Sequence, residues 1–119
     1  MPGPLTIIVP KHPSLPDCLS PNNGIALRIP DNAAARALIR AAGGALAASS
    51  ANLSGRPPAC DGPSALAELA GRVAVVLDGG PTAGNIPSTI VSYLQPEPVI
   101  LREGPLSAAQ LCLSAKATV

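Results

Sequence analysis

Residues 5–9 read LTIIV, and this aliphatic run, in which all but the first residue are β-branched, is typical of a β-strand. Pro10 closes the run, because proline cannot donate to a strand ladder. The proline-studded segment Pro10–Pro21 follows and predicts a surface loop with His12 exposed to solvent. Beyond it, Ile25–Ile29 (IALRI) predicts a second strand. The opening of the chain therefore indicates a sheet.

A helix and a third strand are expected next along the chain. Asp31 can accept backbone N–H bonds as an N-cap, and Ala33–Ala42 is rich in strong helix formers. Gly43 and Gly44 end this predicted helix. The small apolar residues Ala45–Ser49 that follow fit a buried strand, which would deliver the chain into a polar loop.

The middle of the chain predicts another helix and another buried strand. Asp61 and Pro63 open a short helix that runs through Ala65–Ala70. Val73–Leu77 (VAVVL) is continuously apolar, as strands covered on both faces are. The turn-rich segment Asp78–Pro87 then leads toward the C-terminal third of the sequence.

Two further strands and a terminal helix complete the prediction. Ser88–Tyr93 and Val99–Arg102 are the expected strands, and Ser107 with Gln110 forms a capping box for a helix that reaches about Ser114. Strands mixed with helices on short connections indicate an α/β or α+β layer fold. With 119 residues, the chain is expected to form a single domain over 1–119.

Composition excludes several classes of function. The net charge of +1 gives no basic surplus for nucleic acid, and Tyr93 as sole aromatic residue argues against base stacking. The spacing of Cys18, Cys60 and Cys112 fits neither a zinc site nor a disulfide framework, so we read them as small apolar fillers. No apolar run is long enough to span a membrane, and a soluble cytoplasmic protein is expected.

The polar residues suit anion binding better than acid–base or nucleophilic chemistry. His12 is the only histidine, no nucleophile accompanies it, and we assign no catalytic side chain and no metal ligand. The loop Ser49–Gly55 has short side chains that let backbone amides approach an oxyanion, although a turn that only satisfies itself is an equal alternative.

The arginines divide into two groups. Arg28, inside an apolar strand and opposite Leu27, needs either a carboxylate ligand or an internal salt bridge. Arg102 ends a strand beside Glu103, where a local ion pair or plain solvation is equally consistent with the sequence. The remaining arginines are expected on solvated faces: Arg36, Arg40, Arg56 and Arg72.

A series of motifs, in order and covering nearly the whole chain, resembles the YrdC family of threonylcarbamoyl-AMP synthases. The motifs are PGPLT (Pro2–Thr6), ALRIP (Ala26–Pro30), SSANLSG (Ser49–Gly55), DGGP (Asp78–Pro81), STIV (Ser88–Val91) and ILREG (Ile100–Gly104). The resemblance implies a twisted mixed sheet flanked by helices, with a groove in which ATP, L-threonine and bicarbonate give threonylcarbamoyl-adenylate and pyrophosphate. The product serves tRNA modification through a downstream transferase, so tRNA is an indirect partner.

The resemblance also implies roles for particular residues. ATP would be bound by Ser50, Asn52, Ser88 and Arg102, and L-threonine by Arg28 with Thr6 in the wall of the groove. A reaction of this kind needs positioning and charge stabilisation rather than a side-chain nucleophile. Mg²⁺ would accompany ATP and be held mainly by phosphates and water.

This sequence also departs from the family pattern. Family members carry, ahead of PGP, a segment with a lysine–arginine motif, whereas here Met1 directly precedes Pro2, and Pro87 and Ser92 replace acidic residues around STIV. We therefore expect a C-terminal part of a YrdC domain with an open sheet edge, which would form a homodimer or need a partner chain with the missing half. The alternatives are a non-catalytic fragment that binds nucleotide or RNA and a YrdC-like domain of a carbamoyltransferase.

Overall fold

The computed structural model of this chain describes residues 2–82 and 86–113. They fall into two compact units, which are described separately below. The first unit combines the described residues of 1–46 and 86–119, and the second those of 47–85. The first unit therefore joins segments that are far apart in the sequence.

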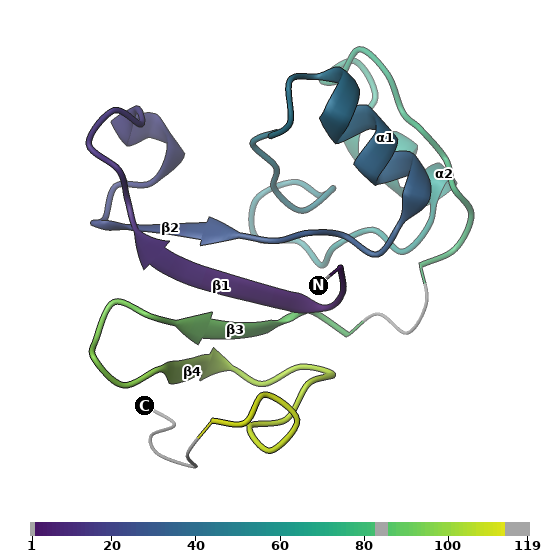
Figure 1. Cartoon of the computed structure of the whole chain (residues 1–119). Coiled ribbons are helices and arrows are strands. Elements are labelled where there is room, and N and C mark those ends of the chain that lie inside the picture. Colours follow the sequence, from purple (N-terminus) through teal and green to yellow (C-terminus); the bar gives the residue numbers. More distant parts are fainter. Residues whose placement is uncertain (1, 83–85, 114–119) are drawn as a thin grey trace. The chain divides into compact units, whose positions relative to one another are not determined.

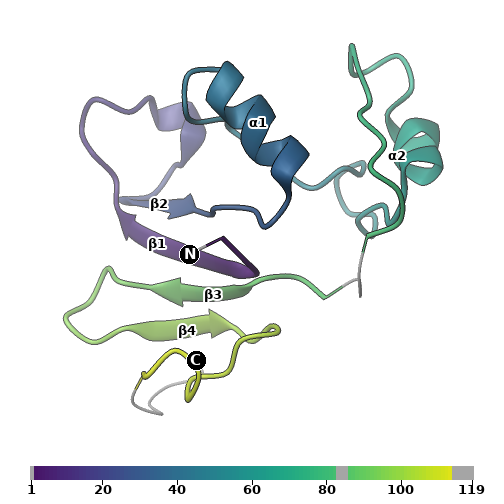
Figure 2. The ribbon, with the colours of Figure 1, turned by 45° about the vertical axis from the view of Figure 1, so that its right-hand side comes forward.

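A mixed four-stranded sheet forms the first unit (Figures 1 and 2). Its strands, in the spatial order β2-β1-β3-β4, are β2 (Gly24–Leu27), β1 (Leu5–Pro10), β3 (Thr89–Ser92) and β4 (Val99–Arg102). The pairs β1–β2 and β3–β4 are antiparallel, whereas β1 and β3 run parallel. The predicted α/β class with a mixed sheet is confirmed, and the four strands lie where LTIIV, IALRI, STIVSY and VILR place them.

The core lies along β3 and the start of β1. Val91 and Thr89 are completely buried, and Leu5 is 7% exposed. Ile7 of β1 pairs with Val91 on one side and with Leu27 on the other. A central strand has partners on both edges, so its backbone groups are satisfied and its side chains lose the most contact with water.

Helix α1 (Ala33–Ala41) belongs to the first unit, and its N-cap corrects the sequence prediction. The side chain of Asn32, not that of Asp31, accepts the bond from the amide of Ala35 at 2.9 Å. Asp31 instead forms an ion pair of 3.1 Å with Arg36. The helix ends as predicted, with Gly43 at φ +104°.

The two predicted strands Ala45–Ser49 and Val73–Leu77 are wrong. Neither segment is a strand, and Leu46, Val75 and Leu77 are 49%, 73% and 73% exposed. Within residues 2–82 and 86–113, no neighbouring strand is available to pair with either segment. An apolar run becomes a strand only where another backbone satisfies its amides and carbonyls.

The second unit is built around helix α2 (Gly62–Leu69), which begins as predicted. The carboxylate of Asp61 caps the helix by accepting from the amide of Ser64 at 2.8 Å. Hydrogen bonds from Ser64 lower the pKa of Asp61. The side chain of Ser64 has the larger effect, and its backbone amide has the smaller one. The carboxylate of Asp78 lies against Gly62 so closely that a Cβ there would overlap it. The DGGP segment thus packs on the start of α2.

The end of the chain keeps its predicted cap but not its predicted helix. The amide of Ser107 donates to Gln110 at 2.9 Å, and the amide of Gln110 donates back to the Ser107 hydroxyl at 3.3 Å. Residues 108–112 nevertheless form turns, and Cys112 has a φ of +54° that interrupts a regular helix. Ser114 lies outside the described residues.

Two other expectations can be compared with the structure. Cys18 and Cys112 are exposed and Cys60 is partly exposed, so the prediction that they fill the interior is wrong; all are free thiols. No helix in the described ranges has the length and apolar character that crossing a membrane requires.

Candidate functional site

Thr6, Ser88 and Arg102 meet at the point where the chain enters β3. The hydroxyl groups of Thr6 and Ser88 lie 2.7 Å apart. The Arg102 guanidinium donates from Nε and Nη2 to the carbonyl of Ser88, at 3.0 and 2.9 Å, and from Nη2 to its hydroxyl at 3.2 Å. Ser88, which is only 5% exposed, thus bonds both to Arg102 and to Thr6, which lies 82 positions away in the sequence.

The geometry of Arg102 differs from one of the two alternatives that the sequence left open. Among the described residues it makes no ion pair with Glu103, and although the residue is exposed, its guanidinium bonds to Ser88. The register of β3 and β4 shifts between Ile90 and Val91, an irregularity of the kind that re-aims a side chain. The Nη1 group takes part in none of these bonds, so it can still donate to an anion.

Arg28 lies directly after β2 rather than inside a strand, which corrects the sequence prediction. Its Nε donates to the carbonyl of Gly3 at 3.1 Å, and the amide of Gly3 donates to Ile29 at 2.9 Å. The expected alternative, an internal salt bridge, is not formed within the described part of the chain. The PGP segment therefore orients Arg28 by its backbone, and neither Nη group makes a bond within the described ranges.

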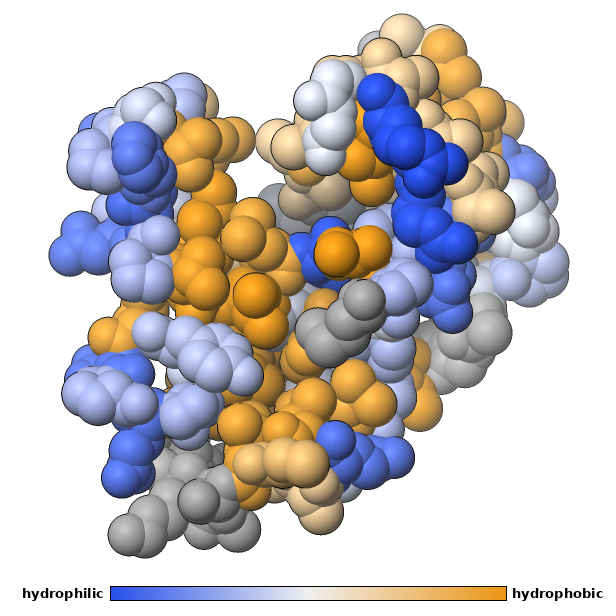
Figure 3. Space-filling model, viewed as in Figure 1, coloured by the Kyte–Doolittle hydropathy of each residue, from blue (hydrophilic) through white to orange (hydrophobic). Residues whose placement is uncertain are grey.

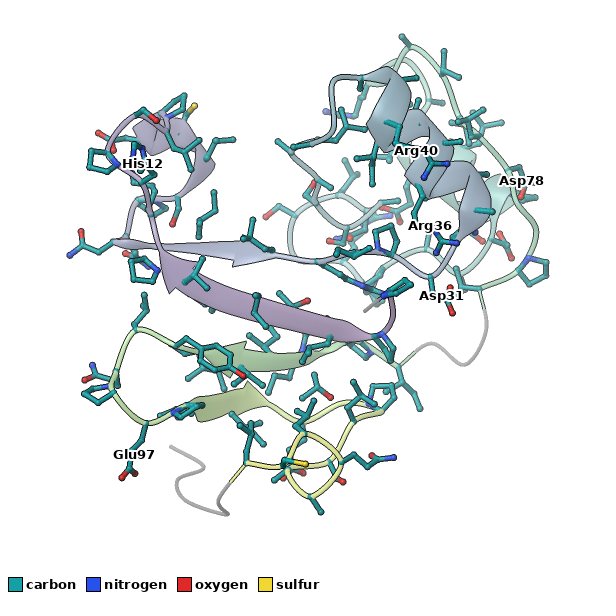
Figure 4. The ribbon with its side chains drawn as sticks, in the orientation of Figure 1. His12, Asp31, Arg36, Arg40, Asp78 and Glu97 are labelled. Carbon is teal, nitrogen blue, oxygen red and sulfur yellow. The ribbon has the colours of Figure 1, made fainter. Side chains whose placement is uncertain are left out.

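Arg28 opens onto a pocket of about 560 Å³ inside the first unit. Its walls are mainly aliphatic, and further cationic groups come from Arg36 and Arg40 of α1, which project from the same helix in Figure 4. Apolar residues gather over the sheet in Figure 3. The aliphatic side chains of the lining come from Leu5, Ile7, Leu27, Ile29, Ile39 and Leu46. Aliphatic walls with guanidinium groups suit a small ligand that carries a carboxylate or phosphate.

The SSANLSG loop lies in the second unit and is folded by Asn52. The side-chain Nδ2 of Asn52 donates to the carbonyls of Leu53 and Arg56, at 2.9 and 2.8 Å. Its Oδ1 is buried and has no hydrogen-bond partner among the described residues. Both donors of the amide are therefore used to shape the loop, and Ser50 lies at its exposed end.

Glu68 of α2 fixes the other side of this loop. Its carboxylate accepts from the amide of Leu53 at 3.1 Å and from Arg56 at 3.0 Å. These bonds lower the pKa of Glu68, with the amide of Leu53 as the main cause. In the part of the chain that the structure describes, the amides of Ser54 and Gly55 form no hydrogen bond, and they remain free for an anion.

The sequence-predicted site residues thus occupy three places. Thr6, Ser88 and Arg102 form one cluster, Arg28 lies in the pocket, and Ser50 and Asn52 shape a loop of the second unit. Sequence reasoning missed Arg36 and Arg40 as pocket residues, because an arginine on a helix surface gives no signal of what it faces. His12 is exposed and bonds to Ser14, as expected of a loop residue.

The family comparison covers most of the chain. Residues 1–104 match the model of the Sua5/YciO/YrdC family, described as "Telomere recombination". A threonylcarbamoyl-AMP synthase of Bacillus subtilis is 42% identical over 115 residues, which are 92% of this chain and 32% of the relative. A putative threonylcarbamoyl-AMP synthase of Mycobacterium tuberculosis is 40% identical, and the match covers 92% of this chain and 51% of that protein.

Solved structures agree with the sequence matches. The crystal structure of Pyrococcus abyssi Sua5 complexed with L-threonine aligns with a TM-score of 0.85 and 32% identity, over 92% of this chain and 33% of that one. Escherichia coli YciO aligns with a TM-score of 0.81 and 27% identity, over 92% and 54%. The chain spans about a third to half of these proteins. Sequence, motifs and fold agree, and the chain belongs to the Sua5/YciO/YrdC family.

Proposed function

We propose that this chain contributes to the synthesis of L-threonylcarbamoyladenylate from ATP, L-threonine and bicarbonate, with release of pyrophosphate. The observation that carries the proposal is Arg28, oriented by the PGP backbone toward an aliphatic pocket with its Nη groups unengaged. The matched relatives are threonylcarbamoyl-AMP synthases, and one structure is a complex with L-threonine. The product would serve tRNA modification through a downstream transferase.

Arg28 would hold the threonine carboxylate. A guanidinium whose Nε is already bonded to a carbonyl presents its Nη edge, and this edge can donate two parallel bonds to a carboxylate. Leu5 and Ile29 line the same pocket and offer apolar contact to the ligand's side chain. Thr6 is not in the lining of this pocket, and its hydroxyl, which bonds to Ser88, would belong to the nucleotide cluster.

ATP would be bound by groups that stabilise charge. Each unit is considered by itself. The first unit offers Nη1 of Arg102 beside Ser88, and the second unit offers Ser50 and, among the described residues, the unbonded amides of Ser54 and Gly55 in the loop shaped by Asn52. The threonine amine and bicarbonate would form a carbamate with loss of water. A carbamate oxygen then bonds to the α-phosphorus as the bond to pyrophosphate breaks, which needs positioning rather than a protein nucleophile.

Mg²⁺ would enter as part of the ATP complex. In the described ranges, no group of three His, Cys, Asp or Glu side chains is placed to hold a metal ion. The expected ligands are therefore triphosphate oxygens and water, an arrangement that Mg²⁺ commonly keeps at nucleotide sites. The chemistry the ion supplies is neutralisation of phosphate charge, while the residues of this chain bind and orient the substrates.

A product assay tests the proposal. The purified chain is incubated with ATP, MgCl₂, L-threonine and ¹⁴C-bicarbonate, and labelled threonylcarbamoyladenylate and pyrophosphate are measured. We expect both products in equal amounts, and their formation should stop when L-threonine is omitted. Pyrophosphate release that does not depend on threonine would contradict the proposed reaction.

A second candidate function is binding of ATP by this chain without turnover. It is favoured by the coverage of the relatives, because the chain spans about a third to half of their length and the remaining segments can supply further substrate groups. Binding of ATP with no labelled product would support this reading.

The expected homodimer or partner chain stays a prediction, which sedimentation velocity tests. Leu101 of the edge strand β4, which is 54% exposed, is an apolar side chain that such an assembly would cover.

A further inference from the structure

Thr89 is completely buried and uses its hydroxyl group twice. The Oγ1 atom donates to the carbonyl of Leu106 at 2.8 Å and accepts from the amide of the same residue at 3.0 Å. This reciprocal pair ties the segment after β4 to the first residue of β3. The hydroxyl is therefore satisfied inside the protein and is not directed at a ligand.

Gly104 brings the same segment into direct contact with the backbone before β3. A Cβ at Gly104 would overlap the Thr89 nitrogen and would lie 2.6 Å from the Pro87 oxygen and 2.7 Å from the carbonyl carbon of Ser88. All of these atoms belong to backbone, which cannot move aside as the end of a side chain can. The segment that begins at Gly104 thus lies against the Ser88–Thr89 peptide group, whose carbonyl accepts from the Arg102 guanidinium.

These contacts converge on the carbonyl of Ser88. Arg102 binds it from one side through Nε and Nη2, and Gly104, two residues further along, packs on its carbon. The direction of the Arg102 guanidinium therefore depends on where residues 103–106 leave the sheet. That path is fixed by the two bonds of the Thr89 hydroxyl.

We propose that Thr89 is a positioning residue that sets the direction of the Arg102 guanidinium by clamping Leu106. The proposal makes two statements. The first, that Thr89 directs the Arg102 guanidinium, concerns the protein without ligand. The second, that Arg102 then offers Nη1 to the nucleotide, rests on the proposed function. The two parts can therefore be measured separately.

The geometric part is tested by NMR of the full 119-residue chain without ligand. The exchange of the Arg102 Nε–H with solvent is measured in the unaltered chain, in Thr89→Val and in Thr89→Ser. Valine keeps the shape and the β-branch but loses both bonds, whereas serine keeps the hydroxyl. We expect Nε–H exchange to be about tenfold faster in Thr89→Val and close to the unaltered value in Thr89→Ser.

Thr82→Val is the matched control. Thr82 lies in the second unit, where its hydroxyl donates to the carbonyl of Cys60 at 3.1 Å, so the same chemical change is made away from the clamp. It should leave the exchange of the Arg102 Nε–H unchanged. Unchanged exchange of Nε–H in a folded Thr89→Val chain would overturn the proposal, and so would faster exchange in Thr89→Ser equal to that in Thr89→Val.

The unaltered chain provides a test if Thr89→Val fails to fold. In urea below the unfolding midpoint, the Leu106 amide and the Arg102 Nε–H should lose protection at the same concentrations. Loss of Nε–H protection while the Leu106 amide stays protected would contradict the clamp.

Titration with ATP and MgCl₂ tests the consequence. We expect the Kd to rise about tenfold in Thr89→Val and to recover in Thr89→Ser. If the unaltered chain binds no ATP, the proposed function fails, and the exchange data still decide the geometric proposal.

Discussion

The segments Thr89–Ser92 (TIVS) and Val73–Leu77 (VAVVL) are both rich in β-branched residues but have opposite structures. In β3, Val91 is completely buried between β1 and β4, whereas Val75 of the second unit is 73% exposed in irregular backbone. The difference lies in the neighbours, because β3 pairs on both edges and Val73–Leu77 has no pairing partner among the described residues. A strand is thus specified by its partners as much as by its own sequence.

The same contrast applies to the candidate binding groups. In the first unit, backbone carbonyls on paired or neighbouring segments orient Arg28 and Arg102, through Gly3 and Ser88 respectively. In the second unit, side chains do this work, with Asn52 and Glu68 holding the loop Leu53–Arg56. Groups held by a sheet are expected to be more resistant to mutation and pH than groups held by exposed side chains.

The largest expected effect comes from the same substitution made in the two segments. Val91→Ala should lower the free energy of unfolding by about 2 kcal/mol, because it removes buried methyl groups and leaves a cavity. Val75→Ala, at an exposed position, should change it by less than about 0.5 kcal/mol. Urea unfolding followed by circular dichroism measures both. Equal losses would mean that Val75 is buried in solution and that the contrast is wrong.

A second prediction separates the residues proposed for L-threonine from the loop residues proposed for ATP. Arg28→Ala should weaken L-threonine binding by roughly tenfold to a hundredfold, since charge-assisted bonds to the carboxylate are lost, and should leave ATP binding largely unchanged. Ser50→Ala combined with Asn52→Ala should weaken ATP by about tenfold with little effect on threonine. Calorimetric titration gives both affinities.

Arg72→Ala is the control for this experiment, because Arg72 is exposed and does not line the pocket. It should alter neither affinity. Parallel loss of both ligands in the Arg28 and the Ser50/Asn52 variants would indicate general misfolding and would remove the support for separate roles.

The smallest expected effect is a pH dependence confined to the second unit. The pKa of Glu68 is lowered from its ordinary value of 4.5 by the amide of Leu53 and by Arg56. A carboxyl group with a lowered folded pKa stabilises the folded loop above its ordinary pKa, and this contribution is lost as pH falls through the lowered value. Protection of the Leu53 amide from exchange should therefore decrease below about pH 4.5.

Glu68→Gln separates this carboxyl from general acid effects. The variant cannot titrate at this position, so protection of the Leu53 amide should no longer change in that range of pH. The amides of β3 report on the first unit and should stay protected throughout. A decrease of the same size in Glu68→Gln and in the unaltered chain would exclude Glu68 as the cause.

The sheet was predictable from sequence where strands found partners. LTIIV and VILR became β1 and β4 with bounds close to those expected, since a short apolar run bounded by proline or charge has few other structures. Val73–Leu77 has the same local signal, and only knowledge of its neighbours could have excluded it. The cap moved from Asp31 to Asn32 because both side chains can accept the same bonds.

The residues alone indicated an anion-binding loop at Ser49–Gly55 and a carboxylate option for Arg28, while the roles of Thr6 and Ser88 came only from the family resemblance. No spacing rule connects Thr6 with Ser88, and the hydrogen bond between them exists because β1 and β3 lie side by side. Taken one at a time, Arg28 left a carboxylate ligand and an internal salt bridge equally open, and Arg102 left an ion pair with Glu103 and plain solvation open. The contact between Thr89 and Leu106 was missed entirely. Threonine is common in β-strands, so its presence in one gives no sign of a further role.

One titration tests most directly the claim that this chain carries binding groups for both substrates. The folded 119-residue chain is titrated with ATP and MgCl₂ in a calorimeter, alone and with L-threonine and bicarbonate present. The account predicts micromolar binding of ATP that becomes tighter when threonine and bicarbonate are added. A sample that unfolds cooperatively but binds neither ATP nor L-threonine would contradict it.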